Sequence, residues 1–433
     1  MSKNLKFPKI AGWLIPGLEV KRWFGLVFLG IALVVVGFMM ISDMRPVFIV
    51  IEWIRHMANI VPTNIIGAMI MLMGFGLFFL GWQRSNVSVF KVTNVKSSSN
   101  DDILETLYRK RKLNRGPKIV AIGGGTGLSM LLKGIKKITN NVTAVVTVGD
   151  DGGSSGRLRE EIGVLPPGDI RNCIAALADD EDLITKLFQY RFKKGEGLEG
   201  HSFGNLFLTA LCAITGDMYR AIKESSNVLS IRGRVLPSTL DDMKLVAEME
   251  DGRIVKGESN IPESGGKIKR LYSDPEDCKA LIDVIRAIKD ADLIILGPGS
   301  LYTSVIPNLL IKEISQSISE SPAKKIYVCN IMTQPGETDG YTVFNHINAI
   351  LNHAGHQNII DAVLVNDKMP ENISRKYEEA GSFPVKLDDE PSRKRAIQVV
   401  SRKLIEENKE GLIRHSSNRV ARAIYYWYRK SGK

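Results

Sequence analysis

Cysteine is scarce in this chain of 433 residues. The four cysteines form no CxxC motif and share no spacing with histidines that would suit a zinc site. The sequence therefore indicates neither a disulfide framework nor a structural metal, and a reducing compartment is the simplest interpretation. The cysteines are Cys173, Cys212, Cys278 and Cys329.

The net charge of +11 lacks the distribution expected of a nucleic-acid-binding protein. Residues 1–115 carry 15 Lys and Arg against 6 Asp and Glu, whereas the remaining residues carry 43 against 41. A near balance over the larger part of the chain provides no broad basic surface. We therefore expect no nucleic-acid partner, and the basicity belongs to the N-terminal segment.

Two long stretches of that segment, Trp23–Ile41 and Ile65–Trp82, contain no charged residue. Each is close to the roughly 20 apolar residues that a helix needs to cross a bilayer. Their length and pairing do not suit a cleaved signal peptide, and the absence of ionisable residues does not favour a transporter. We therefore expect residues 1–90 to form a two-helix transmembrane hairpin anchor.

Basic residues are concentrated before the first apolar stretch and after the second, while those between them are offset by acids. The positive-inside rule then predicts a multi-pass protein of the cell membrane, with both termini and the globular domain in the cytoplasm. Between the stretches, residues 47–60 are amphipathic and suit the outer interface, with His56 on the polar side. Residues 91–116 form a polar and basic linker, which either contacts anionic lipid or presents a solvated helix face.

Residues 117–433 begin with an apolar strand, Lys118–Ile122, and a helix follows at Leu128–Ile138. Three further β-branched or apolar runs each end in a polar loop, and they are Val142–Val148, Ala291–Leu296 and Lys325–Asn330. Continuous apolar strands that alternate with helices indicate a parallel sheet covered on both faces. The predicted fold class is α/β, a Rossmann-like doubly wound and mainly parallel sheet.

Glycine-rich or polar loops follow all four predicted strands. In a doubly wound sheet these loops meet at the carboxyl edge, where ligands bind, and helix amino termini there attract phosphate. Each loop alone is equally well explained as a tight turn, but four together favour a binding site. The predicted ligand-binding residues of these loops are Gly123, Gly124, Gly125, Thr126, Gly127, Asp150, Asp151, Gly152, Gly153, Ser154, Ser155, Gly297, Gly299, Ser300, Thr333 and Gln334.

The carboxylates Asp150 and Asp151 suit either Mg²⁺ or the hydroxyl groups of a ribose or sugar, because carboxylates alone would repel phosphate. They are the predicted metal ligands, although a ligand-orienting role explains them as well. A proline-stiffened loop adds Asp169, Arg171 and Asn172, where Arg171 either clamps a phosphate or pairs with Asp169.

The HSFGN segment contributes His201 and Asn205 to the predicted site. His201 is either an acid–base group or a helix cap. Asp150, Asp169 and His201 are thus the candidate catalytic residues, with no role assigned firmly.

Two other segments differ from this pattern. Residues 236–272 contain short alternating runs around Asp251 and Gly252, which predict a small antiparallel excursion and a possible oligomer contact. The C-terminal segment, residues 420–433, mixes aromatic and basic residues. It suits either a membrane or partner surface, or a final helix that packs on the core.

The ordered motifs IGGGTGLS, DDGGSSGRLR, LPPGDIRNC, HSFGNLFL, IRGRVLPST, GPGSLYTSVIPNLL and CNIMTQPGETDGYT closely resemble the bacterial gluconeogenesis factor family. These YvcK-like proteins belong to the superfamily of the 2-phospho-L-lactate transferases of deazaflavin coenzyme synthesis. The resemblance extends from about Lys118 to Arg422. This chain differs from most members of that family in having the predicted N-terminal hairpin.

The resemblance implies a Rossmann-like protein that binds UDP-N-acetylglucosamine and directs carbon into cell-wall precursors, with an effect on cell shape. We expect no required cofactor, enzymes of cell-wall precursor synthesis as partners, and a homo-oligomer. By local match, the family's pocket Tyr and Arg fall on Tyr377 and Arg414, whose chemistry suits uracil stacking and diphosphate pairing.

Two other functions remain open. A transferase would move a phosphate-bearing group from a nucleotide donor, with Mg²⁺ as the electrophile. A membrane-tethered scaffold would recruit partners without a ligand, which the intact glycine and acidic loops do not favour. Whether the protein is an enzyme is therefore undecided, and a ligand-binding regulator is the preferred hypothesis.

Overall fold

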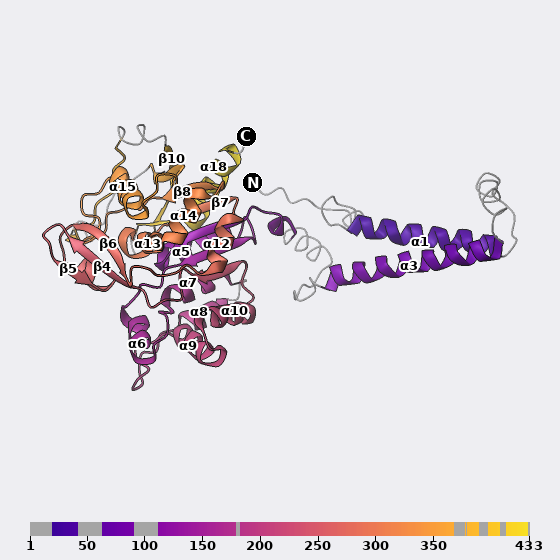
Figure 1. The fold of residues 1–433 in the computed structure, drawn as a ribbon, viewed down its shortest axis with the longest axis horizontal. Coiled ribbons are helices and arrows are strands. Elements are labelled where there is room, and N and C mark those ends of the chain that lie inside the picture. Colours follow the sequence, from indigo (N-terminus) through magenta and orange to yellow (C-terminus); the bar gives the residue numbers. More distant parts are fainter. Residues whose placement is uncertain are drawn as a thin grey trace. The chain divides into compact units, whose positions relative to one another are not determined.

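The computed structural model describes residues 20–41, 63–90, 111–178, 182–367, 377, 379–388, 397–407 and 413–431. The chain forms two compact units, Met1–Asn114 and Arg115–Lys433, which we describe separately (Figure 1). The predicted interfacial segment 47–60 lies outside the described residues, as does most of the predicted linker, residues 91–116.

In the first unit, helices α1 (Val20–Ile41) and α3 (Thr63–Phe90) pack side by side (Figure 1). A Cβ added to Gly30 would lie 2.7 Å from the Gly74 carbonyl oxygen, so glycine permits the close approach of the two backbones. The two predicted apolar stretches are thus helical. Within the described residues, no helix combines the length and the apolar character that crossing a membrane requires.

The second unit is built on a seven-stranded sheet in which every pair of neighbouring strands is parallel. The strand order is β10-β9-β8-β7-β1-β2-β3, so the chain reverses its direction of winding between β1 and β7. Ligand crevices form at the carboxyl side of such a switch point. The strands are β1 (Ile119–Gly123), β2 (Val142–Val146), β3 (Arg234–Pro237), β7 (Leu293–Leu296), β8 (Lys324–Val328), β9 (Ala362–Asn366) and β10 (Gln398–Arg402).

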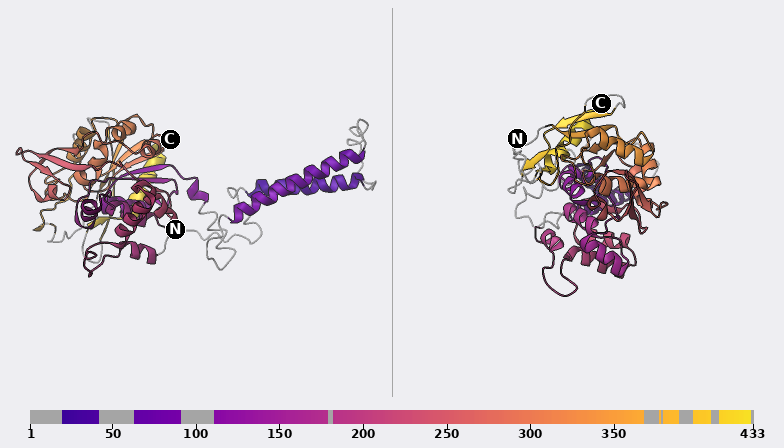
Figure 2. Two further views of the ribbon diagram at one scale, coloured as in Figure 1. Left: turned by 60° about the horizontal axis from the view of Figure 1, so that its bottom comes forward. Right: turned by 90° about the vertical axis from the view of Figure 1, so that its left-hand side faces the viewer.

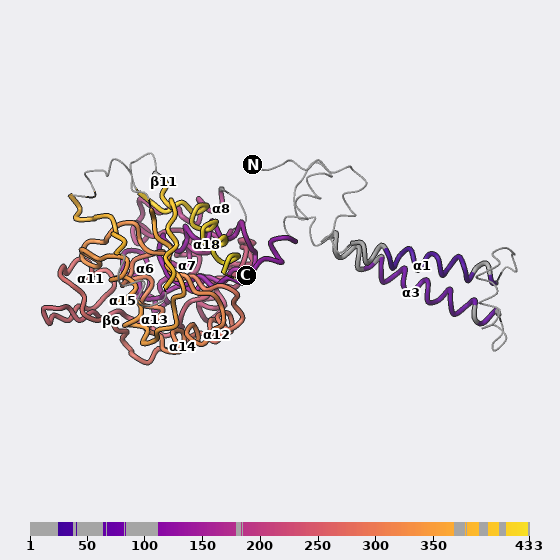
Figure 3. Tube along the Cα trace, turned by 90° about the horizontal axis from the view of Figure 1, so that it is seen from above, coloured from indigo at the N-terminus to yellow at the C-terminus, as the bar shows by residue number. Residues whose placement is uncertain are grey.

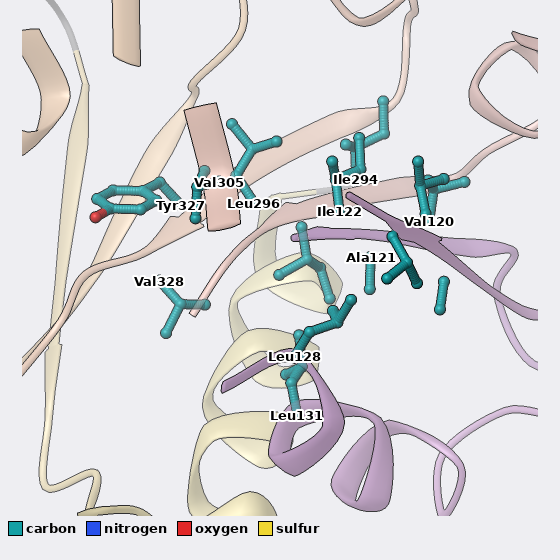
Figure 4. Close-up of a cluster of buried hydrophobic side chains, with 14 of the residues drawn as sticks. Val120, Ala121, Ile122, Leu128, Leu131, Ile294, Leu296, Val305, Tyr327 and Val328 are labelled. Atoms are coloured by element: carbon teal, nitrogen blue, oxygen red, sulfur yellow. The ribbon is translucent and has the colours of Figure 1, made fainter. Parts of the chain in front are cut away.

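Helices cover the sheet, and all residues of β1, β2 and β7 are buried, as predicted for a parallel sheet (Figures 2 and 4). Leu128 and Leu131 of the helix that follows β1, α5, pack below Ala121 and Ile122 in the core (Figure 4). The helical segments are α5 (Gly125–Ile135), α6 (Gly153–Ile162), α7 (Gly168–Leu177), α8 (Asp182–Gln189), α9 (Phe203–Thr215), α10 (Met218–Val228), α11 (Asn260–Glu263), α12 (Ile282–Lys289), the π-helical η2 (Leu301–Val305), α13 (Ile306–Leu310), α14 (Lys312–Glu320), α15 (Val343–Ala354) and α18 (Ser417–Ser431).

The predicted antiparallel excursion is confirmed. It consists of β4 (Lys244–Met249), β5 (Ile254–Lys256) and β6 (Ile268–Asp274), with Gly252 at φ +88° in the β4–β5 hairpin. Its predicted start at Leu236 is wrong, because Leu236 lies in β3 of the main sheet. A second antiparallel pair, β11 (Ile405–Glu407) and β12 (Ile413–His415), was not predicted from the sequence.

The C-terminal helix α18 packs on α5 and buries Val420, Ala421, Ile424 and Trp427. The residue before its first turn lies close to the start of β11, where the Ser416 amide donates to the Leu404 carbonyl oxygen (Figure 3). Core packing, one of the two predicted roles of this segment, is therefore confirmed. The closest approach is at Gly134 of α5, where an added Cβ would lie 2.1 Å from the Ser417 carbonyl oxygen.

Replacing Gly134 by alanine should therefore destabilise the protein. Alanine ordinarily stabilises a helix interior by about 1 kcal/mol relative to glycine. Overpacking against the α18 backbone should outweigh that gain, and we expect the free energy of unfolding in urea to fall by about 1–3 kcal/mol. The exposed Lys133→Ala substitution on the same helix is the control and should change it by less than about 0.5 kcal/mol. An unchanged or more stable G134A variant would contradict the packing.

Candidate functional site

A cavity of about 1040 Å³ lies at the carboxyl ends of the parallel strands. The loops after β1, β2, β7 and β8 all contribute to it, on both sides of the switch point between β1 and β7. The predicted site residues that line the cavity are Gly124, Gly125, Thr126, Gly127, Asp150, Asp169, Asn172, Gly299, Ser300, Thr333, Gln334, Tyr377 and Arg414. The structure therefore brings together residues that are almost 300 positions apart in the sequence.

The glycine turn after β1 is where three loops meet. A Cβ on Gly124 would lie 2.6 Å from Asp169 Oδ2, and one on Gly127 would lie 2.4 Å from the Pro298 carbonyl oxygen. Gly125 has φ +62°, a conformation that glycine adopts without strain. Helix α5 begins at Gly125, so the amide groups of its first turn lie at the cavity wall. Such a helix start attracts anions.

The loops after β7 and β8 are joined by side-chain amides. Gln334 Nε2 donates to Ser300 Oγ at 2.7 Å, and Asn330 Nδ2 donates to Gln334 Oε1 at 3.1 Å. Thr333 Oγ1 accepts from the Phe383 amide at 2.9 Å, which ties the β8 loop to a later segment. Gly297, by contrast, does not line the cavity, and its amide donates to the Ile122 carbonyl oxygen.

Four carboxylates line the cavity, each from a different segment of the chain: Asp150, Asp169, Glu258 and Glu337. Burial is the main cause that raises the pKa of Asp169 to about 6, and the Asp150 carboxylate adds to it. The same two causes raise the pKa of Glu258 to about 8. Burial likewise raises the pKa of Glu337 to about 7. Near neutral pH, part of this acidic lining is therefore protonated.

Sequence reasoning missed Glu258 and Glu337. Glu258 follows β5 in the excursion that we interpreted only as a hairpin, and Glu337 lies in the motif from which we took Thr333 and Gln334. Glu337 accepts from the Tyr302 amide at 3.2 Å and from Thr303 Oγ1 at 3.4 Å. In both places the only sequence signal was a carboxylate directly after a glycine.

Asp151 lies outside the cavity lining and has a different role from Asp150. Its carboxylate accepts from the Glu258 amide at 3.0 Å and from the Ser259 amide at 2.9 Å, which holds the segment after β5 in place. Within the described ranges, no group of three or more His, Cys, Asp and Glu residues is arranged to hold a metal ion. The predicted pairing of Asp150 and Asp151 on one Mg²⁺ therefore gains no support from this geometry.

Other predicted residues form a buried polar network beside the cavity rather than its wall. Ser154 Oγ lies 2.9 Å from His201 Nδ1 and accepts from Asn205 Nδ2 at 3.0 Å, which links α6 to α9. Burial, then the Arg157 charge, lowers the pKa of His201. His201 does not line the cavity, and its ring is buried and hydrogen-bonded in the interior. The N-cap of α9 is Ser202, not His201.

Three further predicted residues lie near the start of α6. Gly152 is its N-cap and Gly153 its first residue, while Ser155 Oγ accepts from the Gly168 amide at 3.1 Å. Arg171 neither reaches the cavity wall nor hydrogen-bonds Asp169. Its guanidinium donates to Ser202 Oγ, and to Asn172 Oδ1 at 2.9 Å, so it orients the amide that does line the cavity.

Tyr377 and Arg414 both lie at the cavity, as the resemblance implied. The Tyr377 hydroxyl accepts from the Ile413 amide at 2.8 Å, and its ring packs against a small apolar cluster that contains Ile331 and Ile405. Arg414 is exposed on β12. An aromatic side chain and a guanidinium thus line the same cavity as the glycine turn, an arrangement that suits a base and a diphosphate.

Known proteins resemble this chain closely. A family model described as 2-phospho-L-lactate transferase CofD matches residues 119–405. The Bacillus subtilis protein named "Gluconeogenesis factor" is 51% identical over 310 residues, which cover 71% of this chain and 97% of its own. A Nostoc sp. protein named "Putative gluconeogenesis factor" is 50% identical over 421 residues, which cover 96% of this chain and 92% of its own. The latter alignment includes most of the N-terminal unit, so some relatives share it.

A crystal structure of a Bacillus halodurans protein has a TM-score of 0.70 and 47% identity. It covers 72% of this chain and 100% of its own, so the globular unit has a counterpart that folds without the N-terminal unit. A second crystal structure, described as a member of the upf0052 family from the same organism, gives a TM-score of 0.69. The chain therefore belongs to the 2-phospho-L-lactate transferase CofD family and, within it, to the gluconeogenesis factors.

Proposed function

We propose that this protein binds UDP-N-acetylglucosamine in the cavity and regulates the flow of carbon into cell-wall precursors, and thereby cell shape. The observation that carries the proposal is the meeting of Tyr377, Arg414 and the amino terminus of α5 at one cavity. The ring offers a stacking face for uracil, the guanidinium pairs with the diphosphate, and the helix start supplies amide donors. The polar side chains of the remaining wall suit sugar hydroxyls.

The acidic lining decides how a diphosphate can be held. Asp150, Asp169 and Glu258 would repel it if all three were ionised. The raised pKa values of Asp169 and Glu258 reduce that repulsion near neutral pH, and a divalent cation would reduce it at higher pH. The proposed ligand therefore needs no cofactor when the acids are protonated.

A transferase is the second candidate function, because the family model is described as a 2-phospho-L-lactate transferase. Asp150 and Asp169 would then hold Mg²⁺ together with oxygens of the nucleotide donor. The cation would supply electrophilic stabilisation as the acceptor oxygen attacks the phosphate that is transferred and a nucleoside monophosphate leaves. The cavity is large enough for a donor and a small acceptor together. Consumption of a nucleotide donor only in the presence of Mg²⁺ would favour this function over the regulator.

We also propose that the N-terminal unit anchors the protein in the cell membrane, with the globular unit in the cytoplasm. Large apolar side chains project outward from both helices, including Phe28, Leu72 and Phe79, which are 69%, 72% and 65% exposed. Such a surface is unfavourable in water but suits lipid. Close packing through Gly30 and Gly74 is typical of helices that associate in a bilayer.

Calorimetry tests the ligand. UDP-N-acetylglucosamine should bind the protein, and Arg414→Ala should weaken binding by about tenfold or more because one charge-assisted contact is lost. Tyr377→Phe should bind nearly as well as the natural protein, whereas Tyr377→Ala should lose the stacking face. Arg220→Ala and Tyr190→Ala, at exposed positions whose side chains do not line the cavity, are the matched controls. Equal affinity of all five variants would sink the proposal.

The affinity should also depend on pH. The diphosphate of a nucleotide sugar keeps its charge between pH 6 and 9, so changes in this range report the protein. Without divalent cations, we expect the Kd to rise by about tenfold as pH increases from 6 to 9, because Glu258 and Glu337 lose their protons. Glu258→Gln should flatten the profile and bind more tightly at pH 9. A profile that stays the same in this variant would contradict the role of Glu258.

Alkaline extraction tests the anchor. The full chain should stay with the membrane pellet after a carbonate wash, whereas residues 115–433 expressed alone should be released. Detergent should solubilise the full chain, which distinguishes membrane insertion from aggregation. Release of the full chain by carbonate alone would exclude the proposed hairpin.

A further inference from the structure

Two segments without an Asp or Glu side chain contribute helices that pack against each other in the globular unit. Residues 106–149 and residues 411–433 contain no Asp or Glu, although residues 116–433 as a whole are nearly balanced in charge. The first segment supplies α5 and the second supplies α18, and these helices lie in contact.

The outer side of α18 presents a regular cationic face. Arg422, Tyr426, Arg429 and Lys430 are exposed and stand at positions i, i+4, i+7 and i+8, which share one side of a helix. Lys430 Nζ lies 4.9 Å from the centre of the Tyr426 ring. In the described part of the chain, none of these three cations forms an ion pair with a carboxylate. We refer to these four residues as the α18 face.

The α18 face lies at the amino edge of the main sheet. Trp427 Nε1 donates to Gln398 Oε1 at 2.7 Å, and Gln398 is the first residue of β10. The pKa of the neighbouring Tyr428 is raised by burial and by the carboxylate of Asp292, which directly precedes β7. Asp292 Oδ2 also accepts from the Lys118 amide at 2.8 Å, just before β1. The face therefore lies where the chain enters the sheet from the N-terminal segment, and the cavity lies at the opposite edge.

We propose that the α18 face docks on an anionic phospholipid surface. Clustered Lys and Arg next to an exposed tyrosine suit the headgroup region, where the cations meet phosphate and the aromatic ring lies at the interface. Charge elsewhere in the unit is nearly balanced, so the basic patch is small. A small patch favours a phospholipid surface over nucleic acid as its partner. This orientation leaves the cavity, at the far edge of the sheet, open to soluble ligands.

The proposal rests on the proposed membrane anchor, which would hold the face at the bilayer, but it can be tested separately. Residues 115–433 suit the test because the crystal structure of the Bacillus halodurans relative shows that this unit folds alone. The probe is sedimentation with vesicles of phosphatidylcholine, with and without phosphatidylglycerol. We expect binding only to the anionic vesicles, with a loss of binding as salt is added.

Three substitutions on the face provide the decisive comparison. R422Q, R429Q and K430Q together should lower the partition coefficient by about tenfold or more, because each basic residue near an anionic surface contributes to binding. The control combines K193Q, K194Q and K223Q, which removes the same charge from other exposed positions. It should change the coefficient by less than about twofold.

Several outcomes would overturn the proposal. These are equal losses in both triple variants, equal binding to neutral vesicles, or no vesicle binding at all. Preferential binding to DNA or to an acidic protein would assign the face to another partner. Affinity for UDP-N-acetylglucosamine should stay unchanged in both variants, which confirms that they are folded. Failure of the docking would thus be distinguishable from failure of the ligand proposal or of carbonate resistance.

Discussion

The parallel pairing of seven strands is the constraint on which the rest of this molecule depends. Because every strand runs in the same direction, every loop that follows a strand emerges at one edge. The reversal of winding between β1 and β7 separates two of these loops and opens a space between them. Gly124 and Gly127 then decide how closely the walls approach, since a Cβ at either position would collide with Asp169 or with Pro298. The parallel direction of the strands and the lack of a side chain on these two glycines together shape the cavity.

The chemistry of that cavity is a balance between opposing charges. Arg414 and the start of α5 attract an anion, while Asp150, Asp169 and Glu258 repel one. Burial shifts the balance because it raises the pKa values of Asp169 and Glu258 toward neutrality. The same carboxylates can therefore donate hydrogen bonds to a ligand when protonated, or hold a cation when ionised. The same cavity lining is therefore compatible with a ligand-binding regulator and with a transferase. Membership of the fold family alone does not decide between these two functions.

The sequence predicted those parts of the fold and site that depend on local pattern. Apolar runs and glycine turns identified β1, β2, β7 and β8, and the Asp251–Gly252 pair identified the β4–β5 hairpin. The strands β9 and β10 lacked an equally clear loop signal, and β11 and β12, an antiparallel pair of three-residue strands, are too short for an alternating pattern. Their pairing is set by tertiary packing, which periodicity does not report.

The candidate site was predicted less evenly, for a physical reason. Residues on the strand-ending loops reached the cavity because topology places them there. Asp151, Ser154 and His201 belong to the same motifs, yet their side chains hold neighbouring segments together. Adjacent residues on a loop point in different directions, so a motif identifies the segment but not the side chain that faces the ligand. Glu258 shows the opposite case, a cavity residue that lies outside every predicted loop. Its segment is held by Asp151, which accepts a hydrogen bond from the Glu258 amide.

The two edges of the sheet carry different chemistry, and this separation follows from the same topology. The carboxyl edge collects glycine, amide and carboxylate groups around a cavity, whereas the amino edge receives the chain from the N-terminal unit and carries the end of α18. Arg429 and Lys430 lie at that second edge, away from the acids of the cavity wall. Cations at the cavity rim would instead face its carboxylates, away from an external surface at the amino edge. A parallel sheet thus lets one small domain keep an acidic binding site and a basic surface apart.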